Sequence, residues 1–214
     1  MIGSQGYMAW IARLRKHALN RHHVAALGRD QRGVAVLEFA FVAPVFIMMM
    51  MGIFNIGQMI YVKSLLNGAV QQAARYSGTE NANTATSDNI VKSIVGRIAV
   101  GGVFTTTRTS YFDFADVNRA EKYTDTNGNG TCNNNEIYFD ENSNGHWDAN
   151  VGVTGNGAAN DVVVMTTRVQ YYPVFRIPFM PNQWQQFTIS STAVTKNQPF
   201  ATQAAYSATT GTCP

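Results

Sequence analysis

Two segments rich in Asp, Asn and Gly carry the side chains in this sequence that are best suited to hold a metal ion. The first, residues 125–136, fits the twelve-residue calcium-loop pattern D-x-[DN]-x-[DN]-G-x5-E. In this pattern oxygen ligands at alternating positions surround a hard cation, and Gly130 permits the sharp turn. The closing glutamate can bind through both of its oxygens. The candidate ligands are Asp125, Asn127, Asn129, Thr131 and Glu136.

The front half of the pattern is repeated fifteen residues later, between residues 140 and 148. Its candidate ligands are Asp140, Asn142, Asn144 and Asp148. Tyr123 and Tyr138 precede the two leading aspartates at the same offset, but Val151 stands where a closing acid would be. The second loop is therefore weaker, or it completes its ligand shell elsewhere. Segments rich in Asn-Gly and Asp also form turns without any metal, so turns remain the alternative to the structural calcium that the tandem pattern predicts.

The two cysteines, Cys132 and Cys213, lie far apart in the sequence, and the first is inside the first loop. In an oxidising compartment we expect this pair to form one disulfide, which would tie the loop to the C-terminus. Two unrelated thiols are the alternative. The spacing matches no zinc site, because the sequence has no CxxC and no His/Cys cluster.

The residue types needed for catalysis are sparse. His146 is the only histidine after residue 33, and it lies inside the second loop. The sequence has no G-x-S-x-G, no P-loop and no HExxH motif. We therefore expect a protein that is not an enzyme.

The positive net charge comes from the N-terminus. Residues 1–33 hold six of the sixteen basic side chains, whereas residues 34–214 hold ten bases and twelve acids. No basic patch interleaved with aromatic residues follows, so we expect no nucleic-acid partner.

Residues 34–54 form an apolar run of 21 residues with Glu38 as its single charge. As a helix this run would be about 30 Å long, enough to cross the hydrocarbon core of a bilayer. Basic residues precede it and none follows before Lys63, so the positive-inside rule predicts a cytoplasmic N-terminus and an exported C-terminal part. A secretory signal peptide fits poorly, because the run is long, carries an acid and lacks an A-x-A cleavage site. Pro44 predicts a kink, read either as an ordinary membrane-helix kink or as a flexible point for extraction from the bilayer.

The remaining pattern predicts an α+β protein. Helical spacing continues to Tyr76 and stops at Ser77-Gly78, and a polar linker covers residues 79–86. Ser87 or Asp88 would cap a short helix through Ile98. Strands are predicted over residues 103–114, 161–175 and 184–196, with a polar loop insertion over residues 123–160 that contributes nothing to a core. The expected parts are a leader (1–33), a transmembrane and amphipathic helix (34–77) and an exported domain with a small antiparallel sheet (78–214).

The start of the apolar run has a pattern of its own. Gly33 precedes Val34, Glu38 would be the fifth residue of a chain cut between them, and Phe39 continues the helix. This arrangement resembles a type IV prepilin processing site, at which a membrane aspartyl peptidase cuts on the cytoplasmic face. A carboxylate in a membrane span is costly without a partner. The resemblance implies that Glu38 pairs with the N-terminal amine of a neighbouring subunit; the alternative is an acid that lies at the headgroup boundary.

The pattern extends further, through Pro44, the glycines at 52 and 57 and residues 61–76. Residues 32–77 together resemble the TadE-like family of tight-adherence pilus systems. Two departures are Asn55, where the family usually has an acid, and a long leader that a start at Met8 would shorten.

The resemblance implies a minor pilin or pseudopilin that acts in assembly of a Flp-type IVb pilus. Its partners would be other pilins through the N-terminal helix, a prepilin peptidase and the pilus assembly machinery of the bacterial inner membrane. The domain would lie in the periplasm and, after assembly, at the cell surface. The competing function is a calcium-stabilised adhesive module on an uncleaved signal anchor, which would need neither Gly33 nor Glu38.

Overall fold

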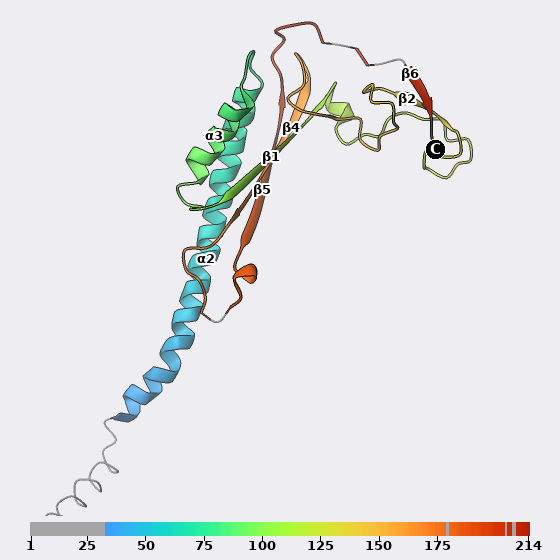
Figure 1. Cartoon of the computed structure of the whole chain (residues 1–214). Helices are drawn as coiled ribbons and strands as arrows, with labels where there is room; N and C mark the ends of the chain where they lie inside the picture. The colour runs from blue at the N-terminus through green and yellow to red at the C-terminus, as the bar shows by residue number, and fades with distance from the viewer. Residues whose placement is uncertain (1–32, 179, 204, 207–208) are drawn as a thin grey trace, which may run out of the picture. The chain divides into compact units, whose positions relative to one another are not determined.

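The structure is a computed structural model that describes residues 33–178, 180–203, 205–206 and 209–214 (Figure 1). The predictions for the basic leader before Gly33 lie outside the described residues. Backbone contacts divide the chain into two units, which meet between Met50 and Met51. The fold is α+β, as the sequence predicts: a long apolar helix precedes a small domain with an antiparallel sheet.

Helix α2, Val34–Ser77, includes Pro44 and extends from the apolar run into the domain. Its apolar side chains in the first unit are exposed; Val36, Phe39 and Phe41 each expose 70% or more of their surface. Among the described residues this is the one helix that is long and apolar enough to cross a membrane, judged by length and composition. In the second unit only one side of α2 is buried, and the apolar residues of that side are Val62, Leu66, Ala69, Val70, Ala73 and Ala74.

Helix α3, Thr84–Val95, begins earlier than the sequence predicts. Asn83 is the N-cap, because its side-chain oxygen accepts a hydrogen bond from Ala85 N at 2.8 Å. The two predicted caps have other roles: the Ser87 hydroxyl donates to Ala73 O of α2 (3.1 Å), and Asp88 forms an ion pair with Arg108 (2.5 Å). The predicted linker over residues 79–86 is therefore too long, since only its residues 79–83 precede α3, and the helix ends at Val95 rather than at the predicted Ile98.

The main sheet has the order β3-β1-β4-β5, and every pairing in it is antiparallel. Its strands are β1 (Val103–Tyr111), β3 (Val153–Thr154), β4 (Val162–Tyr171) and β5 (Phe187–Lys196). The three long strands are shorter than predicted. Asp113 accepts a hydrogen bond from Phe114 N and starts the 3-10 turn η2 (Phe114–Asp116), while Pro173 cannot extend the ladder. Trp184 belongs to the 3-10 turn η3, Asn182–Trp184.

The core lies between the helices and one face of this sheet. Leu66 and Val70 of α2 meet Val91 and Val95 of α3 and a row of sheet residues, which are Met165, Val169, Tyr171, Ile189 and Ala193. The opposite face carries several threonines and serines, such as Thr166 and Thr192, whose hydroxyls lie 2.9 Å apart. A sheet with one buried face follows from the alternation along each strand.

The insertion over residues 123–160 is more ordered than predicted. It contains β2, Ile137–Asp140, which pairs with β6, Thr209–Thr212, in a second antiparallel sheet. The prediction that this segment contributes nothing to a core is wrong, because Tyr138 is 4% exposed and packs with Cys132 and Cys213. Val151, 2% exposed, packs with Tyr111 and Val162 of the main sheet.

Candidate functional site

The first loop is organised by two carboxylates that accept hydrogen bonds from backbone N–H groups. Asp125 accepts from Gly128 and Asn129 through Oδ1 (2.7 and 3.1 Å) and from Gly130 through Oδ2 (2.9 Å). Glu136, 4% exposed, closes the loop. Its Oε1 accepts from Thr126 N (2.8 Å) and Asn127 N (3.3 Å), and its Oε2 accepts from Asn133 N (3.1 Å).

The second loop has the same arrangement around Asp140, whose two oxygens accept from Asn144 N (3.0 Å) and Gly145 N (2.9 Å). The closing carboxylate is Glu121, which is 1% exposed and precedes both loops in the sequence. Its Oε1 accepts from Glu141 N (2.8 Å) and Asn142 N (3.3 Å), and its Oε2 accepts from Asp148 N (3.0 Å).

The two glutamates occupy equivalent places. We count the leading aspartate of each loop, Asp125 or Asp140, as position 1. In each loop one oxygen of the closing glutamate accepts from the backbone N–H groups at positions 2 and 3, and its other oxygen accepts from the N–H at position 9. The third residue also donates its side-chain amide to the ninth: Asn127 to Asn133 Oδ1 (3.0 Å), and Asn142 to Asp148 Oδ2 (2.7 Å). Each glutamate therefore closes the loop of the other repeat.

Glu121 is the functional residue that the sequence analysis missed. The signal was present, because Glu121, Tyr123 and Asp125 have the same spacing as Glu136, Tyr138 and Asp140. The repeat thus begins four residues before each aspartate, and the two tyrosines form an antiparallel bridge. Sequence order hides the exchange, because the calcium-loop pattern places a closing acid after each loop and Glu121 precedes both loops.

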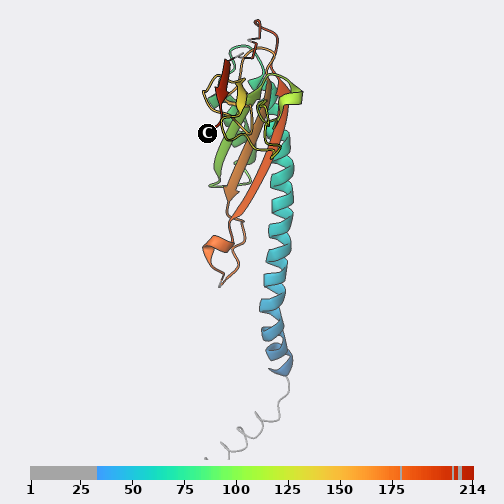
Figure 2. The ribbon, with the colours of Figure 1, turned by 90° about the vertical axis from the view of Figure 1, so that its right-hand side faces the viewer.

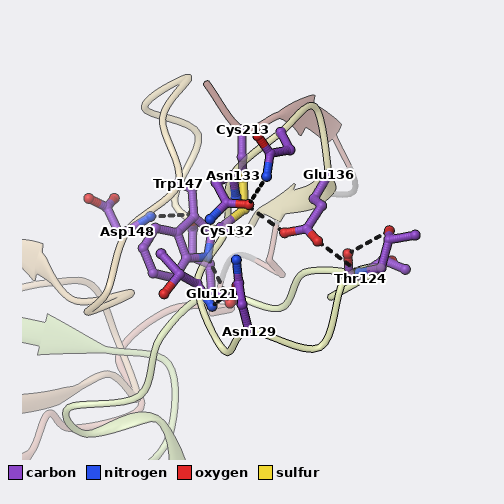
Figure 3. The surroundings of a disulfide bond; sticks show 12 residues. Glu121, Thr124, Asn129, Cys132, Asn133, Glu136, Trp147, Asp148 and Cys213 are labelled. Carbon is purple, nitrogen blue, oxygen red and sulfur yellow. Dashed lines mark hydrogen bonds between the residues drawn. A yellow bond between two sulfur atoms is a disulfide. The ribbon is translucent and has the colours of Figure 1, made fainter.

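A disulfide joins Cys132 of the first loop to Cys213, with their Cα atoms 5.6 Å apart. Figure 3 shows the disulfide with Asn133, Glu136, Trp147 and Glu121 around it. Backbone hydrogen bonds continue the connection: Cys213 N donates to Glu136 O (2.8 Å) and Asn135 N donates to Cys213 O (3.2 Å). Trp147 Nε1 donates to Glu121 O (3.2 Å), and its ring meets Tyr123 edge to face. The C-terminus, both loops and both glutamates therefore form one connected structure.

Glu121, the closing acid of the second loop, is a carboxylate in a buried environment. Burial raises the pKa of Glu121 above its ordinary value, although three backbone N–H donors act to lower it. Within the described part of the chain, no ion pair neutralises this carboxylate. An ionised Glu121 is thus a buried negative charge, and a bound cation would stabilise it.

A neighbouring cluster of ionised groups holds the second loop to the domain. Arg119 binds Glu141 (2.5 Å) and Asp116 (2.8 Å), and Asp116 also accepts a short hydrogen bond from the Tyr206 hydroxyl. Burial acts to raise the pKa of Asp116 and of Glu141. Hydrogen bonds from Tyr206 and Arg119 to Asp116, and from Arg119 to Glu141, outweigh it and lower both pKa values.

The chemistry open to this region is cation binding by mixed oxygen ligands. Among the described residues, no three His, Cys, Asp or Glu side chains lie together as a metal-holding group. A cation would therefore need neutral oxygen ligands besides the carboxylates. The candidates are the side-chain oxygens of Asn127, Asn129, Asn142 and Asn144 and an oxygen of Thr131. Such oxygen-rich ligand sets suit calcium rather than a transition metal.

The predicted processing residues belong to the other unit. Gly33 directly precedes α2, and a Cβ added to it would meet no heavy atom within 4 Å. Val34 is 50% and Phe39 71% exposed, and Glu38 is exposed as well. The described residues around the predicted cut are thus exposed.

A comparison with known families matches residues 33–75 to the family described as TadE-like protein. The predicted resemblance of residues 32–77 to this family is thereby confirmed, and it indicates a function related to tight-adherence pili. The match covers Gly33 and most of α2 and ends before the sheet. No curated protein and no solved structure matches the chain.

The exchange of glutamates predicts crossed effects on hydrogen exchange. Glu121→Gln should speed amide exchange in the second loop, at Glu141 and Asn142 or at Asp148, because one carboxylate oxygen becomes an amide nitrogen that cannot accept from a backbone N–H. Glu136→Gln should likewise speed exchange in the first loop, at Thr126 and Asn127 or at Asn133. Each change should cost about 1–3 kcal/mol of unfolding free energy.

Both variants would be measured in the full chain in detergent micelles, by hydrogen exchange with mass spectrometry. Glu80→Gln, at an exposed position, is the matched control and should change neither loop. Faster exchange in the first loop alone after Glu121→Gln would contradict the exchange of glutamates.

Proposed function

We propose that this chain, whose residues 33–75 match the TadE-like family, is a minor pilin or pseudopilin of a tight-adherence, Flp-type IVb pilus. The observation that carries the proposal is the place of the match. It covers the apolar run and the segment Gly33, Val34, Glu38 and Phe39 that resembles a prepilin processing site. In this proposal a prepilin peptidase cuts after Gly33, and the parts of the mature protein are the helix of residues 34–77 and the domain of residues 78–214.

The exposed first half of α2 supports assembly through this helix. Its large apolar side chains are exposed in the described chain, so lipid or other helices would cover them. Small residues let helices approach closely in a membrane, and this half contains Ala35, Ala40, Ala43 and Gly52. The partners would be the corresponding helices of other pilins, within the inner-membrane assembly machinery.

The predicted orientation and the disulfide agree with each other. The basic residues before the span favour a cytoplasmic N-terminus and a periplasmic domain. A disulfide such as Cys132–Cys213 persists in oxidising compartments, of which the bacterial periplasm is one. The proposed role is structural, and we propose no catalytic activity.

Calcium is the proposed structural cofactor of the domain. The first loop offers the full pattern from Asp125 to Glu136, and Glu121 supplies the second loop with the closing carboxylate that its own sequence lacks. Both loops are already held in the turn by backbone N–H donors, so little ordering would oppose binding. The buried charge of Glu121 would gain a counter-ion.

Processing after Gly33 predicts a defined mature N-terminus. Protein taken from its native membrane should begin at Val34 when the prepilin peptidase is present and keep its leader when the peptidase gene is deleted. Intact mass and N-terminal sequencing measure both. A leader retained in both strains would contradict processing and favour the signal-anchored adhesive module.

Pairing of Glu38 with the amine of a neighbour predicts an assembly defect without an insertion defect. Glu38→Ala should lower the yield of assembled pili roughly tenfold or more, because it removes the partner of a charge in lipid. The amount of chain in the membrane should not change. Sheared-pilus yield and membrane fractionation measure the two effects, with Glu80→Ala as the matched control. Normal pilus yield in Glu38→Ala would count against the pairing.

Calcium binding predicts a higher melting temperature. Millimolar Ca²⁺ should raise the midpoint of the full chain in detergent by about 5–10 °C, because a ligand that binds only the folded state stabilises it. Mg²⁺ should do less, since it is smaller and keeps its water. Asp125→Asn should remove most of the shift and Asp140→Asn a smaller part. An unchanged midpoint with Ca²⁺ would rule out the calcium sites.

A further inference from the structure

Two connections of the domain lie against the same turn of α2. They are the segment between α3 and β1, residues 96–102, and the described part of the segment between β4 and β5, residues 172–178 and 180–186; we call them together the collar. In Figures 1 and 2 the β4–β5 segment lies at one end of the main sheet, and the small sheet of β2 and β6 lies at the other end. The collar is therefore remote from the Asp- and Asn-rich loops.

Hydrogen bonds fix the collar to the turn of α2 that starts at Phe54. Asn55 Nδ2 donates to Phe175 O (2.7 Å) and is part of a buried side chain. Gln58 accepts from Val174 N (3.1 Å) and donates to Ile98 O (3.4 Å), so it holds both segments. The rings of Phe54 and Phe175 lie 5.8 Å apart.

This turn is where the apolar run ends. Phe54 is the last residue of the run, and Asn55 is the first polar residue after Glu38 other than glycine and proline. If the run spans a bilayer, Phe54 lies at the boundary between hydrocarbon and headgroups. The collar contacts that boundary residue directly, so it lies at the same depth.

The collar exposes large apolar side chains that the domain does not cover. Val100 is 74%, Trp184 72% and Val174 68% exposed, and Phe175 is 43% exposed. An open groove of about 350 Å³ runs between Phe54, Val100 and Val174. A group of exposed apolar residues of this kind indicates a contact with a partner or a membrane.

The charges of the collar favour a lipid partner. Its only ionised residues are Arg97 and Arg176, and no acidic residue lies in the sequence between Asp88 and Asp113 or after Asp161. The guanidinium of Arg176 lies 5.0 Å from the ring centre of Tyr172. Aromatic residues beside arginine are typical of the membrane interface, where anionic headgroups attract the cations.

Hydrogen bonds within the β4–β5 segment stabilise its conformation. Gln185, whose side chain is buried, accepts from Ile177 N (2.8 Å) and donates to Met180 O (2.7 Å), which ties these three residues together. Pro173, Pro178 and Pro181 restrict the backbone further, and η3 ends at Trp184. A surface held in this way loses little conformational entropy when it binds.

We infer that the collar is a membrane-contacting surface: it rests in the headgroup region of the bilayer that α2 crosses, with Trp184 inserted. This inference rests on the proposed membrane anchorage of α2. It assigns the domain a second attachment, which limits how far the domain tilts away from the membrane. A second copy of the chain or another pilin on this surface is the competing outcome.

The test is quenching of tryptophan fluorescence by lipids brominated on their acyl chains. The full chain would be reconstituted in vesicles of phosphatidylethanolamine and phosphatidylglycerol, with and without brominated phosphatidylcholine. A W10F/W147F variant keeps Trp184 alone, and W10F/W184F keeps Trp147, which lies beside the disulfide, as the matched control. We expect brominated lipid to lower Trp184 emission roughly twofold and to leave Trp147 emission unchanged, because only an interfacial ring reaches the quencher.

Alkaline carbonate extraction of the same vesicles separates the two proposals. A chain that carbonate removes from the membrane would contradict the anchorage of α2 and with it the collar inference. A chain that stays in the membrane while Trp184 emission ignores brominated lipid would overturn the collar inference alone. Blue-shifted Trp184 emission that also ignores brominated lipid would show that protein covers the collar, which overturns the inference too.

Hydroxyl-radical footprinting gives the same answer in the unaltered chain, should either variant fold poorly. Trp184 is the more exposed of the two rings in the structure. In vesicles we expect Trp184 to be oxidised less than Trp147. Oxidation of Trp184 above that of Trp147 in membrane-anchored chain would overturn the inference.

Discussion

The buried side of α2 between residues 62 and 74 is the surface on which the domain is assembled. Leu66 and Val70 contact α3 and the sheet together, so neither layer has a core without this helix. A backbone that crosses lipid must satisfy its hydrogen bonds internally, and a continuous helix meets that condition. The helix of the apolar run, α2, continues into the domain, where one of its sides packs against α3 and the sheet. The proposed membrane anchor and the fold of the domain therefore depend on the same helix.

The insertion is ordered by a different interaction. A segment with so few apolar residues cannot offset its loss of conformational entropy by burial alone. Carboxylates that accept several backbone N–H groups at once supply much of the stabilisation that burial would otherwise give. Asp125 and Asp140 do so within their own loops, and Glu121 and Glu136 each do so for the loop of the other repeat. Because each glutamate closes the other repeat, the two loops depend on each other. The Cys132–Cys213 disulfide and the β2–β6 pairing then bind this structure to the C-terminus.

The two ends of the domain have opposite electrostatic character. Nine of the twelve acidic residues after residue 33 lie between Asp113 and Asp161, in or near the loops. The collar carries arginines and exposed apolar side chains instead. Anionic lipid repels the acidic end and attracts the collar, so the charge distribution alone favours one orientation of the domain at a membrane.

The long helix, the fold class, the TadE-like resemblance of residues 32–77 and the approximate place of the three long strands follow from the sequence alone. These features depend on local periodicity and on a short linear motif, which neighbouring residues specify. Tertiary structure decided the rest. Asn83 rather than Ser87 or Asp88 caps α3, because Ser87 is drawn to the backbone of α2 and Asp88 to Arg108. Glu121 closes the second loop because the chain folds back through the Tyr123–Tyr138 bridge, and β2 finds its partner near the C-terminus. Contacts between residues distant in sequence leave no periodic signal, because only the folding of the chain brings those residues together.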